Sequence, residues 1–456
     1  MRSLKGKRVV VMGLGVFGGG VGAVRFLCRE GARVTVTDLR PASDLRASLE
    51  KLDGCSITLK LGGHDTADFQ SADLIVANPG VPRSSAFLKL AEAAGIPIST
   101  EICLFVERCP APVVGVTGSS GKTTTTSLLF EMVRRHHPGT FVGGNIGASL
   151  LGQLDHMKKE TPVILELSSF QLDYLGDLPW SPKVAVVTNF APNHLDVHGS
   201  LDAYRRAKYQ IVAHQGEDGV AVVNADDAEV NGWVIQGDAR RFAFGLCTKS
   251  VPGIFLDANE ICYQDTGPVQ TLCGAEEIRL TGRHNLANAL AASGAALRMG
   301  VCPQKIVEAV REFSGVAHRL ERVAEVDGIT YYNDSIATSP DRTRVALEAF
   351  SGRVVLIAGG SDKGLAFDRL GPVIAEKVCD LILMGKTGDA IAGAVPRDGR
   401  VVFHRAETLE DAVCVAKSVA QNGDVVLLSP ASASYDMFRN FEERGERFKQ
   451  LVCERL

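Results

Sequence analysis

The sequence has little of what characterises membrane proteins, nucleic-acid-binding proteins and disulfide-stabilised proteins. The uncharged run at residues 9–24 superficially resembles a signal peptide, but glycines interrupt it and it falls short of the ~20 apolar residues that span a bilayer. No basic stretch stands out, and the net charge of −4 argues against nucleic acid as a main partner. The 11 cysteines form no C-x-x-C pair, which disfavours zinc ribbons and thioredoxin chemistry and fits reduced thiols. We therefore expect a cytoplasmic protein without membrane insertion.

Aromatic residues are also scarce, at 6% of the chain, whereas glycine supplies 47 of the 456 residues. Because these glycines do not lie in low-complexity sequence, they indicate many tight turns, as in α/β folds with phosphate-binding loops. Apolar residues make up 45% and charged residues 22%, which argues against disorder, collagen or coiled coil for most of the chain. The length predicts about three domains.

Strand and helix signals alternate along the chain in three sets. The short apolar runs lie at residues 8–12, 33–37 and 74–77 in the first set, at residues 113–116, 163–166, 184–188 and 219–223 in the second, and at residues 329–332, 354–358, 381–384, 401–403 and 424–428 in the third. Helices are predicted between the runs, including residues 123–135 and the alanine-rich residues 283–299. This alternation predicts an α/β fold with parallel sheets in three domains, residues 1–100, 101–314 and 315–456.

A glycine motif follows the first predicted strand. Gly13, Gly15 and Gly18 have G-x-G-x-x-G spacing and open a predicted helix, and Asp38 ends the next predicted strand. The glycines let the backbone approach a diphosphate at a helix N-terminus, and the carboxylate can bind a ribose hydroxyl. Three interpretations stay open: a tight turn without ligand, an NAD(P) site, and a site for another nucleotide diphosphate, which we favour.

A P-loop variant lies between the strand at residues 113–116 and the helix that follows. Its residues are Thr117, Gly118, Ser119, Ser120, Gly121, Lys122, Thr123 and Thr124. Backbone N–H groups can hold phosphates there, Lys122 can reach the β- and γ-phosphate oxygens, and the Thr123 hydroxyl can bind Mg²⁺. Val116 stands where the strict motif has glycine. Because a simple ATPase needs no Rossmann-like domain, the two motifs together predict ATP-driven chemistry on a second nucleotide-bearing substrate.

Further polar residues follow predicted strands of the second set, at the sheet edge where ligands of α/β proteins bind. Glu166, His194 and Asp196 could complete a Mg²⁺ shell around ATP, although each alone is more often a surface or capping residue. Asn285 and Asn288 lie three residues apart and therefore share one helix face, where both amides could contact adenine. Helix capping by Asn285 is the alternative.

Together these motifs resemble the Mur ligase family over nearly the whole chain. Besides the P-loop, the matching segments are residues 143–147, 165–172, 188–196, 282–292, 317–321, 333–338 and 429–436, followed by Phe438, Phe441, Arg444, Gly445 and Phe448. The C-terminal segment is similar to that of members that add D-glutamate, and the Asp-Asn-Pro-Arg motif of members that add diaminopimelate or lysine is absent. The resemblance implies a Rossmann-like N-terminal domain, a P-loop ATPase-like central domain and a Rossmann-like C-terminal domain.

The resemblance also implies an activity and its contacts. The expected enzyme is a monomeric, ATP-dependent amide ligase that joins D-glutamate to UDP-N-acetylmuramoyl-L-alanine through an acyl phosphate, in peptidoglycan precursor synthesis. The implied contacts of the UDP-substrate are Gly15, Val16, Phe17, Gly18, Asp38, Arg40, Asn78, Pro79, Gly80 and Asn145. The implied contacts of ATP are the P-loop residues with Asn285, Asn288, Arg319 and Asp334, and those of D-glutamate are Thr338, Lys363, Ser434 and Phe441.

The resemblance assigns catalytic and metal-binding roles as well. The implied catalytic residues are Lys122, His194, Lys208 and Arg319, and the implied contacts of two Mg²⁺ ions are Thr123, Glu166, His194 and Lys208. A lysine at the position of Lys208 is carbamylated in the family, which converts a cation into a carboxylate-like metal ligand. Many relatives have lysine where this chain has Ile336, so Lys363 is expected to hold the D-glutamate carboxylate alone. A nicotinamide oxidoreductase, an ATP-hydrolysing switch and a ligase for another amino acid stay open as alternatives.

Overall fold

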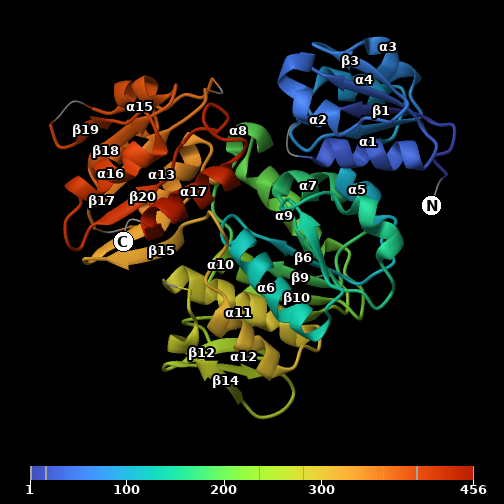
Figure 1. Cartoon of the computed structure of the whole chain (residues 1–456). Helices are drawn as coiled ribbons and strands as arrows, with labels where there is room; N and C mark the ends of the chain where they lie inside the picture. The colour runs from blue at the N-terminus through green and yellow to red at the C-terminus, as the bar shows by residue number, and fades with distance from the viewer. Residues whose placement is uncertain are drawn as a thin grey trace. The chain divides into compact units, whose positions relative to one another are not determined.

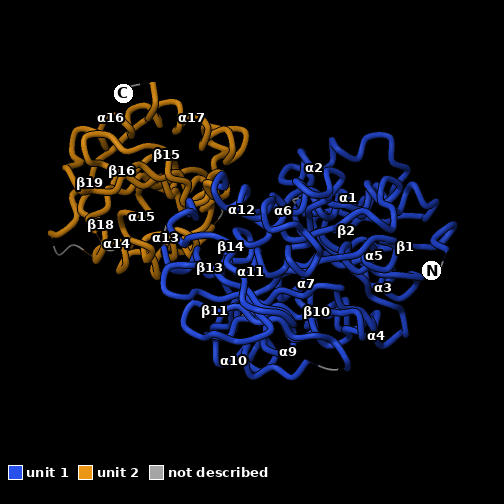
Figure 2. The backbone as a smooth tube through the Cα atoms, turned by 90° about the horizontal axis from the view of Figure 1, so that it is seen from below, with its two compact units in different colours: residues 1–313 blue, residues 314–456 orange. Residues whose placement is uncertain are grey.

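The computed structural model describes residues 3–15, 18–235, 237–280, 282–350, 352–362, 364–396 and 399–454. The chain divides into two compact units, residues 1–313 (unit 1) and residues 314–456 (unit 2), and each is described by itself (Figure 2). Over the described residues, unit 1 contains two sheets and unit 2 contains one (Figure 1). No helix in this described part of the chain is both long and apolar enough to cross a membrane.

The first sheet of unit 1 is parallel throughout its described strands and has the order β3-β2-β1-β4-β5. Its strands are β1 (Arg8–Met12), β2 (Arg33–Asp38), β3 (Ile57–Leu61), β4 (Leu74–Ala77) and β5 (Ile98–Ser99), and its helices are α1 (Gly19–Arg29), η1 (Ala42–Leu45), α2 (Arg46–Glu50), α3 (Thr66–Ser71), α4 (Ala86–Ala93) and α5 (Glu101–Val106). Because β2 and β4 lie on opposite sides of β1, the strand order reverses at β1. Doubly wound sheets bind ligands at the carboxyl edge of such a reversal, and the glycine motif lies there.

The second sheet of unit 1 has the order β14-β13-β12-β11-β10-β9-β6-β8-β7 among the described strands. Its strands are β6 (Val113–Thr117), β7 (Phe141–Gly144), β8 (Val163–Glu166), β9 (Val184–Val187), β10 (Val220–Asn224), β11 (Arg240–Gly245), β12 (Gly253–Asp257), β13 (Glu260–Gln264) and β14 (Gln270–Gly274). Its helices are α6 (Lys122–His136), η2 (Leu150–His156), α7 (Ser169–Leu175), α8 (Leu195–His198), α9 (Leu201–Ala213), α10 (Ala228–Asn231), η3 (Ala275–Glu277), α11 (Arg283–Arg298) and α12 (Pro303–Glu312). The P-loop follows β6, which lies between β8 and β9.

Apolar residues cover both faces of this second sheet. Val184 and Val186 of β9 belong to the core formed with α6 and α11, whereas Ala185 and Val187 belong to the core that contains α7, α9 and the first sheet. Side chains alternate across a strand, so a parallel strand of this kind must be apolar on both faces. The core shared with the first sheet explains why residues 1–313 form one compact unit.

Unit 2 is built on a sheet of order β15-β16-β20-β17-β18-β19 in its described residues. Its elements are β15 (Glu321–Val326), β16 (Ile329–Asn333), α13 (Pro340–Glu348), β17 (Val354–Gly359), α14 (Gly371–Lys377), β18 (Val378–Met384), α15 (Gly388–Ala394), β19 (Val402–Arg405), α16 (Leu409–Val419), β20 (Val425–Leu428) and α17 (Phe441–Glu454). Only β15 pairs antiparallel with its neighbour among these strands. One face packs against α13, α14 and α15, and the other against α16 and α17.

The α/β fold with parallel sheets is confirmed, and three predicted strands coincide with β1, β4 and β8. The predicted strands did not include β3, β5, β7, β11 and β12. They also did not include β13, β14 and β15, which run antiparallel to their neighbours. Exposed polar residues interrupt the apolar runs in these strands, as in the Glu-Arg-Val-Ala-Glu-Val sequence of β15. The domain boundaries at residues 100 and 314 stay predictions.

A buried carboxyl group joins two strands of unit 2 at their carboxyl ends. Asp334, which follows β16, donates its N–H to the Leu428 carbonyl at 2.7 Å, and the Ser429 hydroxyl donates to Asp334 Oδ2 at 2.7 Å. The Leu320 N–H donates to Oδ1 at 3.2 Å. Burial raises the pKa of Asp334 from an ordinary 3.8 to about 7, and these hydrogen bonds oppose the rise.

This pKa predicts a pH dependence of stability. Between about pH 4 and pH 7 the folded protein holds a proton on Asp334 that the unfolded chain has released, so the contribution of this group to stability falls as pH rises through that window. An Asp334→Asn variant lacks this titration. We expect the free energy of unfolding of wild type, measured by calorimetric melting, to fall relative to that of Asp334→Asn between about pH 4 and about pH 7, by up to about 4 kcal/mol. Parallel melting profiles of the two proteins would contradict this assignment.

Candidate active site

The glycine loop of the first sheet is held by the carboxylate of Asp38. The Gly15 N–H donates to Asp38 Oδ2 at 3.1 Å, and the Arg40 N–H donates to Oδ1 at 2.9 Å. Gly15 has a φ of 63°, in the left-handed region that favours glycine. Sequence spacing therefore brings Gly15, Asp38 and Arg40 together at one edge, where Asp38 shapes the loop through backbone hydrogen bonds. Val16 and Phe17 lie outside the described residues.

Asn78, at the end of β4, lies directly beside this loop. A Cβ on Gly13 would stand 3.0 Å from Asn78 Cβ, and one on Gly15 would stand 3.1 Å from Asn78 Nδ2. The Asn78 side chain also accepts from the Gly80 N–H at 3.1 Å, which shapes the turn through Pro79. The predicted residues of β1, β2 and β4 thus converge where the strand order reverses.

The P-loop needs glycine at two positions because neighbouring side chains fill the space. A Cβ on Gly118 would stand 1.9 Å from Thr188 Oγ1, and one on Gly121 would stand 2.2 Å from Asn288 Oδ1. Gly121 is the N-cap of α6 with a φ of 77°, so the positive end of the helix dipole faces the loop. Asn288 also donates to Asn285 Oδ1 at 3.2 Å, and the two amides therefore lie together beside the P-loop.

The segment after β9, which contains Asn189, holds the P-loop through hydrogen bonds. Sequence reasoning missed this role. The Ser120 N–H donates to Asn189 Oδ1 at 2.9 Å, and the Ser119 N–H donates to the Asn189 carbonyl at 3.0 Å. The Ser119 hydroxyl also lies 3.0 Å from the Tyr204 hydroxyl of α9. Asn189 stood in a matched segment, but nothing in its spacing indicated that it would hold the loop.

Lys208 points from α9 to the P-loop and is buried, with 1% of its surface exposed. Its Nζ donates to the Gly118 carbonyl at 2.8 Å, and Lys122 Nζ donates to the same oxygen at 2.9 Å. Burial lowers the pKa of Lys208 well below its ordinary value, the charge of Lys122 lowers it further, and Glu166 opposes both. Two lysines therefore gather where a P-loop is expected to hold phosphate.

Glu166 ends β8 with its side chain buried at the same edge of the sheet. Its Oε1 accepts from Asn145 Nδ2 at 2.8 Å, but Oε2 is buried and makes no hydrogen bond to the described residues. An orphaned carboxylate oxygen beside a P-loop fits a hard cation such as Mg²⁺, which prefers oxygen ligands and keeps substrate phosphates and water. No three His, Cys, Asp or Glu side chains of the described residues form a metal cluster, so phosphate and the Thr123 hydroxyl would have to complete such a shell.

His194 lies at the start of α8 with a φ of 52°, which is unusual for a residue other than glycine. Its ring centroid lies 5.1 Å from that of Phe170 in α7, and the His198 ring stacks on Phe170 at 5.2 Å. His198 Nε2 lies 3.0 Å from the Ser169 hydroxyl. His198 carried no sequence signal, yet it shares this aromatic cluster with His194. The side chain of Asp196 lies outside the described residues.

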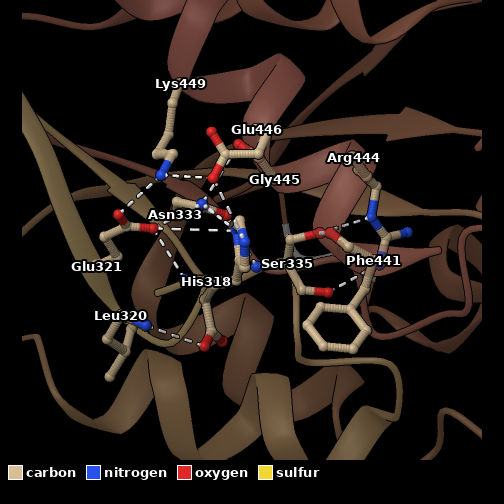
Figure 3. Close-up of polar contacts among 11 residues, drawn as sticks. His318, Leu320, Glu321, Asn333, Ser335, Phe441, Arg444, Gly445, Glu446 and Lys449 are labelled. Carbon is tan, nitrogen blue, oxygen red and sulfur yellow. Dashed lines mark hydrogen bonds and ion pairs between the residues drawn. The ribbon is translucent and has the colours of Figure 1, made fainter. Parts of the chain in front are cut away.

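In unit 2, the buried guanidinium of Arg444 joins two matched segments, residues 333–338 and 429–436. Arg444 Nε donates to the Ser335 hydroxyl at 3.0 Å, and Nη2 donates to the Ser335 carbonyl at 2.9 Å (Figure 3). Nη2 also donates to the Ser432 carbonyl at 3.2 Å. Burial lowers the pKa of Arg444 to about 9, and Asp436 opposes the fall. The Ser335 hydroxyl in turn donates to the Phe441 carbonyl at 2.8 Å. Sequence reasoning missed this role of Arg444.

The remaining predicted residues of unit 2 lie on the same segments. Ser434 is buried, and its carbonyl accepts from the Phe438 N–H at 2.8 Å, while the Thr338 N–H donates to the Ile336 carbonyl at 2.8 Å. Arg342 Nη1 also donates to that Ile336 carbonyl, at 3.0 Å. Lys363 lies outside the described residues.

A hydrogen-bond network joins residues 317–321 to α17 (Figure 3). Arg319 stands in sequence between His318 and Leu320, which both belong to it. The His318 N–H donates to Glu321 Oε2 at 2.8 Å, and Lys449 Nζ of α17 lies 3.1 Å from Glu321 Oε1. Asn333 Nδ2 lies 3.0 Å from His318 Nδ1. Burial lowers the pKa of His318, and Glu321 opposes the fall. The network places the backbone of Arg319 next to Asp334, which accepts from the adjacent Leu320 N–H.

Three family models match consecutive parts of the chain. They are described as the Mur ligase MurD-like N-terminal domain at residues 7–100, the Mur ligase middle domain at residues 116–296, and the Mur ligase glutamate ligase domain at residues 318–432. Together the three matches include most of the candidate site residues of both units.

Curated relatives match over the full length. A UDP-N-acetylmuramoylalanine–D-glutamate ligase of Roseiflexus sp. (strain RS-1) is 44% identical, with 98% of this chain and 99% of the relative covered. A ligase of the same name from Symbiobacterium thermophilum is 42% identical, with 98% of each chain covered.

Solved structures of more distant proteins share the fold. A UDP-N-acetylmuramate-alanine ligase of Thermotoga maritima has a TM-score of 0.56 at 20% identity and covers 99% of this chain and 100% of its own. A MurF ligase of Thermotoga maritima in complex with ADP has a TM-score of 0.54 at 19% identity, with 99% of this chain and 96% of the other covered. With relatives at this identity over its whole length, the chain belongs to the Mur ligase family.

Proposed function

We propose that this protein is an ATP-dependent ligase that adds D-glutamate to UDP-N-acetylmuramoyl-L-alanine in the cytoplasm, as a step of peptidoglycan precursor synthesis. The observation that carries the proposal is 44% identity over 98% of the chain to a relative named for this reaction. The geometry supports it, because a P-loop with two converging lysines and a glycine loop of nucleotide-binding type lie in the same compact unit.

The proposed reaction uses ATP to activate a carboxylate. An oxygen of the L-alanine carboxylate attacks the γ-phosphorus of ATP, ADP leaves, and an acyl phosphate forms. The amine of D-glutamate then attacks the acyl carbon, the C–O bond to phosphate breaks, and an amide, inorganic phosphate and a proton are released. A carboxylate is a poor acyl donor until it is phosphorylated, so ATP is consumed by the chemistry itself.

The P-loop residues from Thr117 to Thr124 are proposed to bind the ATP phosphates. Lys122 would neutralise charge that develops on the transferred phosphoryl group, and the amides of Asn285 and Asn288 would contact adenine. Arg319 and Asp334 of unit 2 are proposed as further ATP contacts. The role of Lys122 is supported by the hydrogen bond that its Nζ donates to the Gly118 carbonyl, which holds the ammonium group at the loop.

The UDP-substrate is proposed to bind across unit 1. Its diphosphate would lie on the glycine loop near Asp38 and Asn78, and its acyl end would extend to Asn145 and His194. Two contacts support these two binding places. Asn78 lies beside the glycine loop at the edge of the first sheet, and Asn145 bonds to Glu166 at the edge of the second sheet. D-glutamate is proposed to contact Thr338, Lys363, Ser434 and Phe441 of unit 2.

Glu166, Thr123, His194 and Lys208 are the residues proposed to hold two Mg²⁺ ions. When bound, Mg²⁺ supplies neutralisation of phosphate charge. Lys208 is proposed to be carbamylated, which would replace one of two neighbouring ammonium groups by an anion. Burial, which lowers the pKa of Lys208, supports carbamylation because the neutral amine is the form that reacts with CO₂. The orphaned oxygen of Glu166 supports a bound cation.

Phosphate release tests the proposed function against its alternatives. We expect release from ATP to require both UDP-N-acetylmuramoyl-L-alanine and D-glutamate, and L-alanine or diaminopimelate to replace D-glutamate poorly. Release that is indifferent to both substrates would support an ATP-hydrolysing switch instead. A change in NADH absorbance with the UDP-substrate would support an oxidoreductase.

Lys208→Ala tests the carbamate. The variant is expected to lose at least about 100-fold in kcat, and formate or acetate should restore part of that loss because a short carboxylate can occupy the place of the carbamate. Lys183→Ala is a matched control, since Lys183 is exposed and pairs only weakly with Asp218 at 3.5 Å. Failure of every short carboxylate to raise the activity of Lys208→Ala would remove the main support for carbamylation.

Lys363→Ala tests the amino-acid site. With Ile336 in place of a second cation, Lys363 is expected to hold the D-glutamate carboxylate, so its loss should raise the KM for D-glutamate about tenfold or more while the KM for ATP changes less than about twofold. Lys377→Ala serves as the control, because the half-buried Lys377 forms an ion pair only with its neighbour Glu376, at 3.7 Å, among the described residues. Equal effects on both KM values would contradict the assignment.

A further inference from the structure

A polar contact between Glu101 and Ser149 joins two parts of unit 1 that are far apart in sequence. Glu101 is the first residue of α5, and Ser149 is the N-cap of η2. The Ser149 hydroxyl donates to Glu101 Oε1 at 2.5 Å and accepts from the Leu151 N–H at 3.4 Å. Burial raises the pKa of Glu101 above its ordinary value, and the Ser149 hydroxyl opposes the rise. The functional site described above uses neither residue.

Glu101 lies near the glycine loop. It lines a small hollow together with Gly13, Gly20, Asn78 and Pro79, which come from the loop after β1, the start of α1 and the turn after β4. Glu101 therefore lines the same hollow as the elements that are proposed to hold the diphosphate. A residue at this place can transmit a displacement of η2 to the glycine loop.

Ser149 begins the segment that packs along α1. A Cβ on Gly22 of α1 would stand 2.3 Å from Ser149 Cβ, so the two backbones are in close contact. Arg29, at the end of α1, donates to the Leu151 carbonyl at 3.3 Å and pairs with Asp155 at 3.1 Å. Ser149 lies only four residues after Asn145, the proposed contact of the acyl end.

We propose that Glu101 and Ser149 are positioning residues that set the separation between the glycine loop and Asn145, and so select UDP-linked substrates long enough to reach both. The inference rests on the proposed function, which places the diphosphate at one of these sites and the acyl end at the other. Neither residue touches the reacting atoms.

The physical argument concerns a substrate held at two points. Binding at the second point is effectively intramolecular, and its strength depends on whether the two sites stand at the separation that the substrate spans. UDP alone is proposed to bind at the glycine loop without reaching Asn145, and ATP is proposed to bind at the P-loop, away from both sites. Loss of the Glu101–Ser149 hydrogen bond should therefore weaken binding of the intact substrate selectively, whereas a loss of folding would weaken binding of all three ligands.

Four variants separate the interaction from its surroundings. Ser149→Ala removes the donor, Glu101→Ala removes the acceptor, and Glu101→Gln keeps an acceptor oxygen of the same shape. Gly22→Ala adds a methyl group where Ser149 leaves no room. Ser71→Ala is the matched control, because its exposed hydroxyl donates only to the Ala67 carbonyl in its own helix.

Calorimetric titration with UDP-N-acetylmuramoyl-L-alanine, UDP and ATP measures the effect on the full-length protein. We expect Ser149→Ala, Glu101→Ala and Gly22→Ala to raise the Kd of UDP-N-acetylmuramoyl-L-alanine about tenfold, with Kd values for UDP and ATP within about twofold of wild type. Glu101→Gln and Ser71→Ala should bind all three ligands like wild type. Thermal melting of each variant establishes that it is folded.

Two results would overturn the inference. One is an equal loss of affinity for UDP and for the intact substrate in Ser149→Ala, and the other is unchanged affinity for the intact substrate in both Ser149→Ala and Gly22→Ala. Failure of the proposed function is a different observation: wild type would then release no phosphate with UDP-N-acetylmuramoyl-L-alanine and D-glutamate, whatever the variants do.

Discussion

The carbonyl oxygen of Gly118 is the acceptor on which the P-loop region of unit 1 depends. It accepts hydrogen bonds from Lys122 at 2.9 Å and from Lys208 at 2.8 Å. Two charged ammonium groups on one acceptor would repel each other in surroundings that screen charge poorly, and burial together with the charge of Lys122 therefore lowers the pKa of Lys208. The fold sustains the pair by bringing the N-terminus of α6, the middle of α9 and the loop after β6 to one edge. The proposed carbamylation of Lys208 would remove the repulsion between the two amino groups.

The same edge explains why the surrounding residues are so constrained. Gly118 and Gly121 have no room for a side chain because Thr188 and Asn288 fill the space. Each of these neighbours comes from a different element, so the shape of the loop is a property of the assembled sheet and its helices. In unit 2, Arg444 plays a comparable part by holding Ser335 and the Ser432 carbonyl from inside the protein. In both units a buried basic side chain donates hydrogen bonds to backbone carbonyls next to a candidate binding segment.

Much of the site could be predicted because its residues lie close together in sequence. The P-loop, the glycine motif with Asp38, and the Asn285 and Asn288 pair depend on spacing along one strand–turn–helix segment or one helix face. Strands such as β1, β4 and β8 were equally accessible, because their runs of apolar residues match burial on both faces of a parallel sheet. The antiparallel strands β13, β14 and β15 could not be predicted in this way, because polar residues interrupt their apolar runs.

The sequence by itself determined the chemistry available to this protein: phosphate-binding loops, carboxylates at strand ends and a family resemblance strong enough to suggest a reaction. Only the tertiary structure decided which side chains meet. Lys208 reaches Gly118 across 90 residues, Ser149 reaches Glu101 across 48, and Arg444 reaches Ser335 across 109. Local spacing carries no information on such contacts. They arise when helices and sheets pack to bury apolar surface, because each buried polar group must then bond to a group that packing has brought near it.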